Sequence, residues 1–193
     1  MQQLHSTMVK NITFFFGTSA KHIDALNKLN LKPSIKETHD LSSLQTIGST
    51  GSPLSHESFE YACNNIKVDA QLSSLSGGTD VLSCFAAGNP IGSVYTGQLQ
   101  NRGLGMDVDA FDKNGNSIKN KKGELVCKSS FPSMPLHFRN DSENKTRHKE
   151  SCFNACDDMW CQADYVEFTN QNGMMFHGRS DYVKSRRDKN RHI

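Results

Sequence analysis

Long hydrophobic runs are missing from the sequence, and no stretch of its 193 residues approaches the roughly 18 apolar residues of a membrane-spanning helix. The opening residues MQQLHSTMVK also lack the apolar core of a secretion signal. These absences predict a cytoplasmic protein with reduced thiols and no membrane span. Charge of one sign is not in excess either, since 22 Lys and Arg face 20 Asp and Glu. Near-neutral charge argues against a dedicated nucleic-acid binder.

Cysteine is present but sparse, and six cysteines in a chain of this length do not indicate a disulfide scaffold. Four residues have the spacing H-x3-C-x3-C-x4-C: His148, Cys152, Cys156 and Cys161. Zinc requires four converging nitrogen or sulfur ligands, but this spacing has no CxxC pair and fits no common zinc module. Ordinary reduced thiols are the simpler interpretation, and a zinc or basic-tail interaction module is a third alternative for the function.

The chain is long enough for a core of its own and corresponds to one domain or one and a half. Eleven phenylalanines argue against general disorder. The charge is uneven, because residues 182–193 carry five basic residues against one acidic residue and the remainder is slightly acidic. We therefore expect a body with a separate basic tail.

Residues 1–95 follow the order strand, turn, helix, strand, turn. An apolar run over 12–16 precedes Thr18 and Ser19, either of which can cap the next helix. Three apolar residues of that helix stand at helical spacing: Ile23, Leu26 and Leu29. A strand within 43–50 is followed by a helix that begins at Ser55 or His56 and runs to Ile66, and a second strand lies within 68–75. This order predicts part of a parallel α/β layer.

Beyond Pro90 the pattern becomes that of antiparallel strands. Residues 104–118 alternate apolar and acidic side chains and turn at Asn114-Gly115, and a strand follows Gly123. A hairpin is expected around Asn172-Gly173, whereas residues 131–158 look polar and irregular. The fold class is thus α/β, and three parts are expected: a partial α/β subdomain over 1–95, a β-rich, barrel-like subdomain over 96–181, and an unrelated tail over 182–193.

Two turns rich in glycine and serine follow apolar strands, at residues 49–54 and 76–80. In open α/β sheets, ligands bind at the carboxyl ends of strands, where such turns present amides and hydroxyls. Thr79 could donate its hydroxyl to a phosphate, and Asp80 could hold Mg²⁺. The alternative is that both are plain turns. Neither is a P-loop, since GxxxxGK[ST] is absent.

Two charged residues stand at the ends of the predicted hairpin. Asp164 opens its first strand and could bind a sugar diol, while Arg179 closes the second strand and could bind an anion. By themselves both residues are equally compatible with solvated turn positions.

Taken in order, these segments resemble the adenylate-forming acyl-CoA ligases, and within them the acetoacetate–CoA ligases. The blocks that carry the resemblance are ITFFFGTSAKHI, LQTIGSTGSPL, SLSGGTDVLSCF, YTGQLQNRGLGMDVDAFD, GELVC, FPSMPL and GRSD. They span residues 10–181 and only a minority of a full-length family member. The resemblance implies the second half of the large adenylating domain, with ATP or AMP, Mg²⁺, CoA and acetoacetate as ligands and no evident protein partner.

The resemblance also implies roles for individual residues. Gly51, Ser52 and Pro53 match the turn that packs on adenine. The strand end that lines the acyl and phosphate pockets matches Ser74, Leu75, Ser76, Gly77, Gly78 and Thr79. Asp80 stands at a magnesium-binding position, Asp164 at the ribose position and Arg179 at a nucleotide-contacting position. Asp181 matches the hinge between the large and small domains.

Several positions depart from the family pattern. Gln162 and Ala163 stand where the family has His and Gly, and Asp157-Asp158 replaces Pro-Gly. The 193 residues include neither the family's phosphate loop nor its catalytic Lys, so no catalytic residue is assigned. We expect a fragment of an acetoacetate–CoA ligase that is inactive alone. The alternative is a degenerate, non-catalytic paralogue that still binds a nucleotide or a partner.

Overall fold

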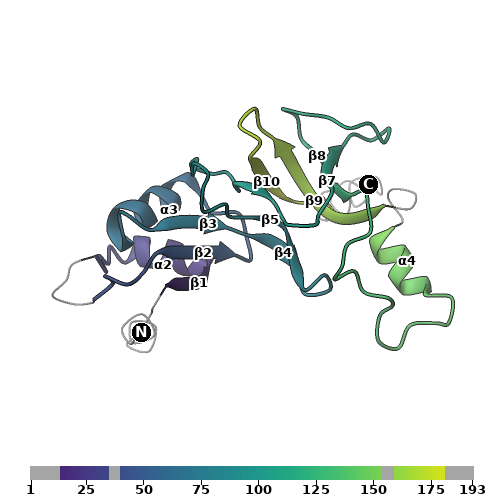
Figure 1. Cartoon of the computed structure of the whole chain (residues 1–193), viewed down its shortest axis with the longest axis horizontal. Coiled ribbons are helices and arrows are strands. Elements are labelled where there is room, and N and C mark those ends of the chain that lie inside the picture. Colours follow the sequence, from purple (N-terminus) through teal and green to yellow (C-terminus); the bar gives the residue numbers. More distant parts are fainter. Residues whose placement is uncertain (1–13, 35–39, 154–158, 181–193) are drawn as a thin grey trace, which may run out of the picture. The chain divides into compact units, whose positions relative to one another are not determined.

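The computed structural model describes residues 14–34, 40–153 and 159–180 (Figure 1). The chain divides into two compact units, and each is described by itself. The first contains residues 1–75 and 88–100, and the second contains residues 76–87 and 101–193. Asp181, Asp157, Asp158, Cys156 and the basic tail lie outside the described residues, so the expectations for them stay predictions. No helix in the described ranges is long and apolar enough to cross a membrane.

The first unit contains a three-stranded parallel sheet, which confirms the predicted α/β layer. Its strands β1 (Phe15–Ser19), β2 (Thr46–Thr50) and β3 (Gln71–Ser74) lie in sequence order. Gly17 pairs with Gly48, and Gly48 with Ser73. The strand β1 therefore extends past the apolar run to Ser19, because the small polar residues after that run still take part in the ladder.

Helices α2 (Ala20–Lys28) and α3 (His56–Tyr61), with the π-helical turn η1 (Ala62–Ile66), supply the core of this unit. Two residues were possible at each helix start, and the structure selects Ser19 and Ser55. Ser19 accepts a hydrogen bond from the amide of His22, and Ser55 accepts one from the amide of Ser58. The prediction that Leu29 belongs to the helix was wrong. The helix ends at Lys28, and Leu29 is 55% exposed in the turn that follows.

The second unit begins with a small antiparallel sheet of β4 (Ser76–Gly78), β5 (Ser83–Ala87) and β6 (Asn101–Arg102). The prediction that Ser76–Gly78 belongs to a turn was wrong, because these residues pair with β5 and the turn starts at Thr79. A Cβ atom at Gly77 would lie 2.1 Å from the carbonyl oxygen of Ser83. Glycine is needed there for close strand pairing, so the Gly-Gly sequence does not mark a turn.

A larger antiparallel sheet, in the order β10-β9-β8-β7, forms the rest of the second unit. Its strands are β7 (Val108–Phe111), β8 (Gly123–Cys127), β9 (Trp160–Phe168) and β10 (Met174–Arg179). The predicted hairpin at Asn172-Gly173 is confirmed, with Asn172 at φ 62° between β9 and β10. Among the described strands the two sheets of this unit stay separate, and they show no closure into a barrel.

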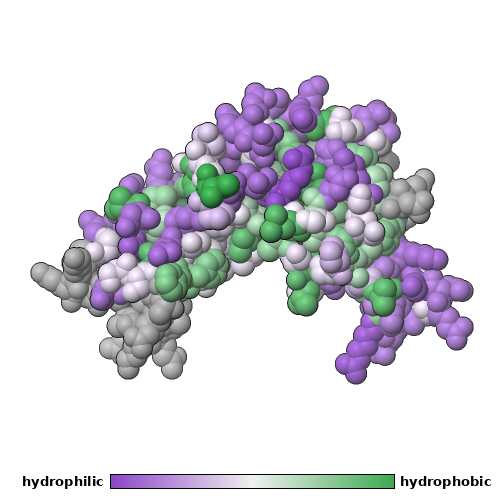
Figure 2. Space-filling model, in the orientation of Figure 1, coloured by the Kyte–Doolittle hydropathy of each residue, from purple (hydrophilic) through white to green (hydrophobic). Residues whose placement is uncertain are grey.

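Residues 131–158 are less irregular than their sequence suggests, because they include helix α4 (Thr146–Cys152). The carboxylate of Asp141 accepts hydrogen bonds from the amides of Arg147 and His148 and so fixes the start of the helix. Its buried face, His148 and Cys152, has too few apolar residues to give a recognisable helical pattern. On the face shown in Figure 2, hydrophobic residues of the described part appear as separate spots among hydrophilic ones.

Candidate functional site

Asp164 and Arg179 lie opposite each other across the β9–β10 ladder. The Oδ1 atom of Asp164 is 3.6 Å from Nη1 of Arg179, and the same Nη1 donates to the carbonyl oxygen of Gln162 at 3.1 Å. The Asp164 side chain is 14% exposed and that of Arg179 is 43% exposed. Two residues that were predicted separately therefore form one ion pair at the open end of the hairpin.

Irregularities in the ladder on both strands surround this pair. Between Cys161 and Tyr165, β9 has three residues opposite a single residue of β8. Ala163 in this bulge has φ 60°, and Gly178, in the corresponding irregularity of β10, has φ 100°. Bulges of this kind redirect side chains and are common beside functional sites. The position of Ala163 favours glycine, and glycine is the residue that the acyl-CoA ligase pattern has there.

Gln162 connects the Asp164–Arg179 pair to the glycine strand. Its side-chain oxygen accepts from the indole Nε1 of Trp160 at 3.0 Å. Its Nε2 atom would lie 3.3 Å from a Cβ atom placed on Gly78. Within the second unit, Gly78 and the charged pair thus meet at Gln162. Sequence reasoning noted Gln162 only as a departure from a family pattern, and no spacing signal pointed to its contacts.

Thr79 and Asp80 follow β4 in an exposed turn. The charge of Asp80 reaches α4, where it adds to the effect of burial in raising the pKa of Cys152 to about 11. A carboxylate is the donor that Mg²⁺ prefers, so Asp80 suits the ion as a single ligand. No group of three metal-binding side chains exists within the described ranges. Magnesium held here would need further oxygen ligands from a substrate or water.

The possible zinc ligands have other roles in the part of the chain that the structure describes. The thiol of Cys161 donates to Glu124 at 3.3 Å, and Glu124 also accepts from Ser180 at 2.8 Å. Cys152 is buried as a free thiol, and burial raises its pKa to about 11.

In the first unit, Gly51, Ser52 and Pro53 leave the carboxyl end of β2 as an exposed turn, with Gly51 at φ 85°. Ser74 ends the neighbouring strand β3, and the amide of Leu75 donates to the carbonyl oxygen of Ser49 at 2.8 Å. The predicted adenine turn and the start of the predicted acyl and phosphate segment therefore lie at the same edge of one parallel sheet.

A row of hydroxyl groups crosses that edge of the sheet, and sequence reasoning missed it. Thr18, Ser49 and Ser74 are aligned in register on adjacent strands. The hydroxyl of Thr18 lies 2.7 Å from Nδ1 of His22, and burial lowers the pKa of His22. Both Nε2 of His22 and Oγ of the buried Ser49 lack a partner among the described residues.

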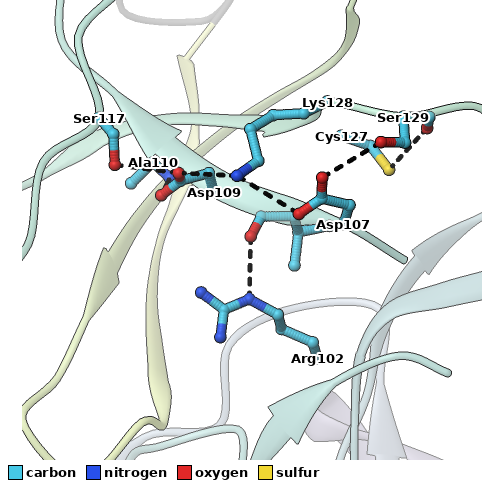
Figure 3. A network of polar contacts seen from close by, with 9 residues as sticks. Arg102, Asp107, Asp109, Ala110, Ser117, Cys127, Lys128 and Ser129 are labelled. Atoms are coloured by element: carbon cyan, nitrogen blue, oxygen red, sulfur yellow. Dashed lines mark hydrogen bonds and ion pairs between the residues drawn. The ribbon is translucent and has the colours of Figure 1, made fainter. Parts of the chain in front are cut away.

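A polar network on β7 and β8 was also not predicted (Figure 3). The Lys128 ammonium bridges Asp107 at 3.3 Å and Asp109 at 3.4 Å. Ser117 donates to Asp109, and Arg102 donates to the carbonyl oxygen of Val108. The network is balanced in charge and joins adjacent strands. We therefore interpret it as a structural network of the sheet and not as a ligand-binding site.

The sequence is similar to those of acetoacetyl-CoA synthetases over most of its length. It is 48% identical over 166 residues to acetoacetyl-coenzyme A synthetase of Rhizobium meliloti (strain 1021). The aligned region covers 86% of this chain and 25% of the relative. The chain is a partial-length homologue of the acetoacetyl-CoA synthetases. The Gallus gallus acetoacetyl-CoA synthetase is 43% identical over the same share of the chain and 24% of its own length. No family model matches the sequence.

Solved structures agree with this assignment. The acetoacetyl-CoA synthetase of Streptomyces lividans matches with a TM-score of 0.78 and 37% identity, over 86% of this chain and 26% of that structure. An anthranilate CoA ligase, AuaEII, matches with a TM-score of 0.72 at 17% identity, over 93% of this chain and 32% of its own, and shows the shared fold alone. The chain thus spans about a quarter of the length of the acetoacetyl-CoA synthetases it matches.

Proposed function

We propose that this chain forms the nucleotide-binding part of an acetoacetate–CoA ligase. The observation that carries the proposal is the Asp164–Arg179 pair, which is aligned in register where the ladder is irregular on both strands. A carboxylate can accept hydrogen bonds from both hydroxyls of a ribose, and a guanidinium can donate hydrogen bonds to a phosphate oxygen. Asp164 would bind the ribose of ATP and Arg179 a phosphate or the ribose oxygen beside it.

Further roles are proposed for residues of the strand-end turns, each within its own unit, from the resemblance to the family. The exposed turn Gly51-Ser52-Pro53 would pack on adenine, and Ser74 to Gly78 would line the acyl and phosphate pockets. Thr79 would donate its hydroxyl to a phosphate oxygen. Asp80 would contribute one ligand to Mg²⁺, which when bound neutralises phosphate charge. Asp181, outside the described residues, would be the hinge, and residues 96–181 would form the barrel-like subdomain of the family.

The proposed reaction has two steps. The carboxylate of acetoacetate attacks the α-phosphorus of ATP, forming acetoacetyl-AMP and releasing pyrophosphate. The CoA thiol then attacks the acyl carbon, forming the thioester and releasing AMP together with the thiol proton. In both steps the residues of this chain would hold the nucleotide in place while charge develops on the phosphate or acyl oxygens. The proposed location of the reaction is the cytosol.

Calorimetric titration of the purified chain with AMP tests the nucleotide site. We expect saturable binding that weakens at least tenfold in Asp164→Asn, since one good charged hydrogen-bonding contact contributes about 1.5–3 kcal/mol. Glu167→Gln is the matched control, because Glu167 lies in the same strand, pairs with His177 at 3.3 Å and should leave AMP affinity unchanged. Equal affinities for both variants and the parent chain would refute the assignment of Asp164.

An exchange assay tests the activity of the 193 residues alone. Because they include neither the family's phosphate loop nor its catalytic Lys, we expect no acetoacetate-dependent exchange of pyrophosphate into ATP. Measurable exchange that disappears in Asp164→Asn would contradict the expectation of inactivity but support the nucleotide site.

A second candidate function is a non-catalytic paralogue that binds nucleotide. It is favoured by Ala163, which occupies a left-handed backbone position, and by Gln162 at the family's His position. The double reversion Gln162→His, Ala163→Gly distinguishes the two functions. A paralogue adapted to these residues would lose AMP affinity on reversion, whereas a ligase segment would keep or improve it.

A further inference from the structure

A cleft of about 920 Å³ lies in the second unit between the segment that follows β8 and helix α4. In Figure 1 this segment descends from β8 and turns back to enter α4. The volume falls within the range of small-molecule sites. The cleft contains none of the residues assigned above to nucleotide, acyl group or magnesium.

One wall of the cleft is apolar and firmly supported. Phe131 and Met134 line it, and Phe131 is only 5% exposed. The Phe131 ring packs edge-on against Phe85 at 5.8 Å and against Trp160 at 5.6 Å. Leu136, which is 77% exposed, continues the wall. This wall offers an apolar ligand a surface that is ordered before binding.

The opposite wall carries positive charge. Lys145 and Lys149 both line the cleft, four residues apart at the start of α4 and within it. Neither ammonium forms an ion pair among the described residues, and like charges at this spacing on a helix repel each other. An anion in the cleft would relieve that repulsion.

A buried polar atom lies in the same wall. His148 lines the cleft, is 6% exposed, and packs edge-on against Phe138, Phe153 and Trp160 at 5.1–6.0 Å. Its Nε2 atom has no hydrogen-bond partner among the described residues. Leaving a buried nitrogen without a hydrogen bond is unfavourable, and a ligand oxygen could supply the missing partner.

We propose that this cleft is a second ligand site, which binds a small organic anion composed of an oxyanion head group and an apolar body. Lys145 and Lys149 neutralise the head group, and the imidazole of His148 hydrogen-bonds to it. The apolar body lies on Phe131, Met134 and Leu136. The head group can be a carboxylate or a phosphate monoester, because two ammonium groups can balance either charge.

Titration of the intact chain with sodium octanoate, sodium octyl phosphate, octanamide and sodium acetate, followed by Trp160 fluorescence, tests the site. We expect saturation by octanoate or octyl phosphate, and the tighter of the two identifies the head group. Octanamide should bind at least tenfold more weakly because it lacks the charge, and acetate because it lacks the apolar body. The proposal would be overturned if octanamide or acetate bound as tightly as octanoate and octyl phosphate. It would also be overturned if none of the four compounds gave saturable binding.

Variants locate the binding. Lys145→Gln with Lys149→Gln should weaken the tighter anion at least tenfold. Lys119→Gln with Lys121→Gln, an equal charge change on exposed residues between β7 and β8, should have little effect. His148→Phe retains a ring in the aromatic cluster and should weaken the anion but not octanamide. Binding that is insensitive to the first pair of changes would place the ligand elsewhere and refute the site.

Discussion

Arg179 holds two parts of β9 at once, since its Nη1 donates to the carbonyl oxygen of Gln162 and lies 3.6 Å from the carboxylate of Asp164. The guanidinium thus spans the bulge, which consists of Gln162, Ala163 and Asp164. It remains 43% exposed, so it can also reach an anion from solution. One residue then both shapes the β9 bulge and offers a contact for phosphate.

Replacing Arg179 by Gln should weaken AMP binding while changing stability little. A half-exposed ion pair contributes at most about 1 kcal/mol to the free energy of unfolding, whereas loss of the phosphate contact should reduce affinity about tenfold or more. Calorimetry and urea unfolding measure the two effects. Arg139→Gln, an equal charge change on an exposed loop residue, is the control and should leave both values unaltered.

Ala163→Gly should stabilise the second unit by about 1 kcal/mol, because glycine adopts φ 60° without the clash that a Cβ atom creates. Trp160, the only tryptophan, reports on this unit in urea unfolding. Ala110→Gly, at a fully buried position in β7, should instead destabilise the same unit. Destabilisation by Ala163→Gly would show that the bulge does not constrain this residue.

Adjacent glycines in β4 should respond differently to alanine. A Cβ atom at Gly77 meets the backbone oxygen of Ser83 at 2.1 Å, so Gly77→Ala should cost about 1–3 kcal/mol by forcing β4 and β5 apart. A Cβ atom at Gly78 meets two side chains: the end of Gln162 at 3.3 Å, which can move, and Val81 Cγ2 at 4.0 Å, an ordinary van der Waals distance. Gly78→Ala should therefore cost less than Gly77→Ala in the same tryptophan-detected unfolding experiment.

Acid should destabilise the second unit through His148. Burial lowers the pKa of His148 below its ordinary value, and the charges of Lys145 and His137 add to this while Asp141 and Asp80 oppose it. The unfolded chain therefore binds the proton first, so this stabilising contribution is complete above about pH 6.5 and declines as the pH falls through and below that value.

Urea unfolding at pH 7.5 and at pH 5.5 measures this effect. The loss of stability between the two pH values should be smaller in His148→Phe, which cannot take up a proton. His177→Gln, which removes an imidazole paired with Glu167 on the hairpin, is the control and should retain the loss seen in the parent chain. An unchanged loss in His148→Phe would mean that another group is responsible.

Local features of the fold could be predicted because they depend on neighbours in the chain. The caps Ser19 and Ser55 bond to amides three residues away, and the hairpin at Asn172-Gly173 needs only its own backbone preference. The predictions failed where distant contacts decide. Ser76–Gly78 became a strand because β5 lies beside it, and α4 was missed because Asp141, rather than a hydrophobic pattern, fixes its start.

From the sequence alone one can predict the parallel and antiparallel character of the two halves and the blocks shared with the acetoacetyl-CoA synthetases, but not the strand β4 or the helix α4. Three relationships depend on tertiary packing: Asp164 faces Arg179, Gly78 lies by Gln162, and His148 lines a cleft beside two lysines. Periodicity and capping act over a few residues, so they can be seen in the sequence. Strand register, bulges and clefts arise from packing between residues far apart in the chain, and no local pattern encodes them.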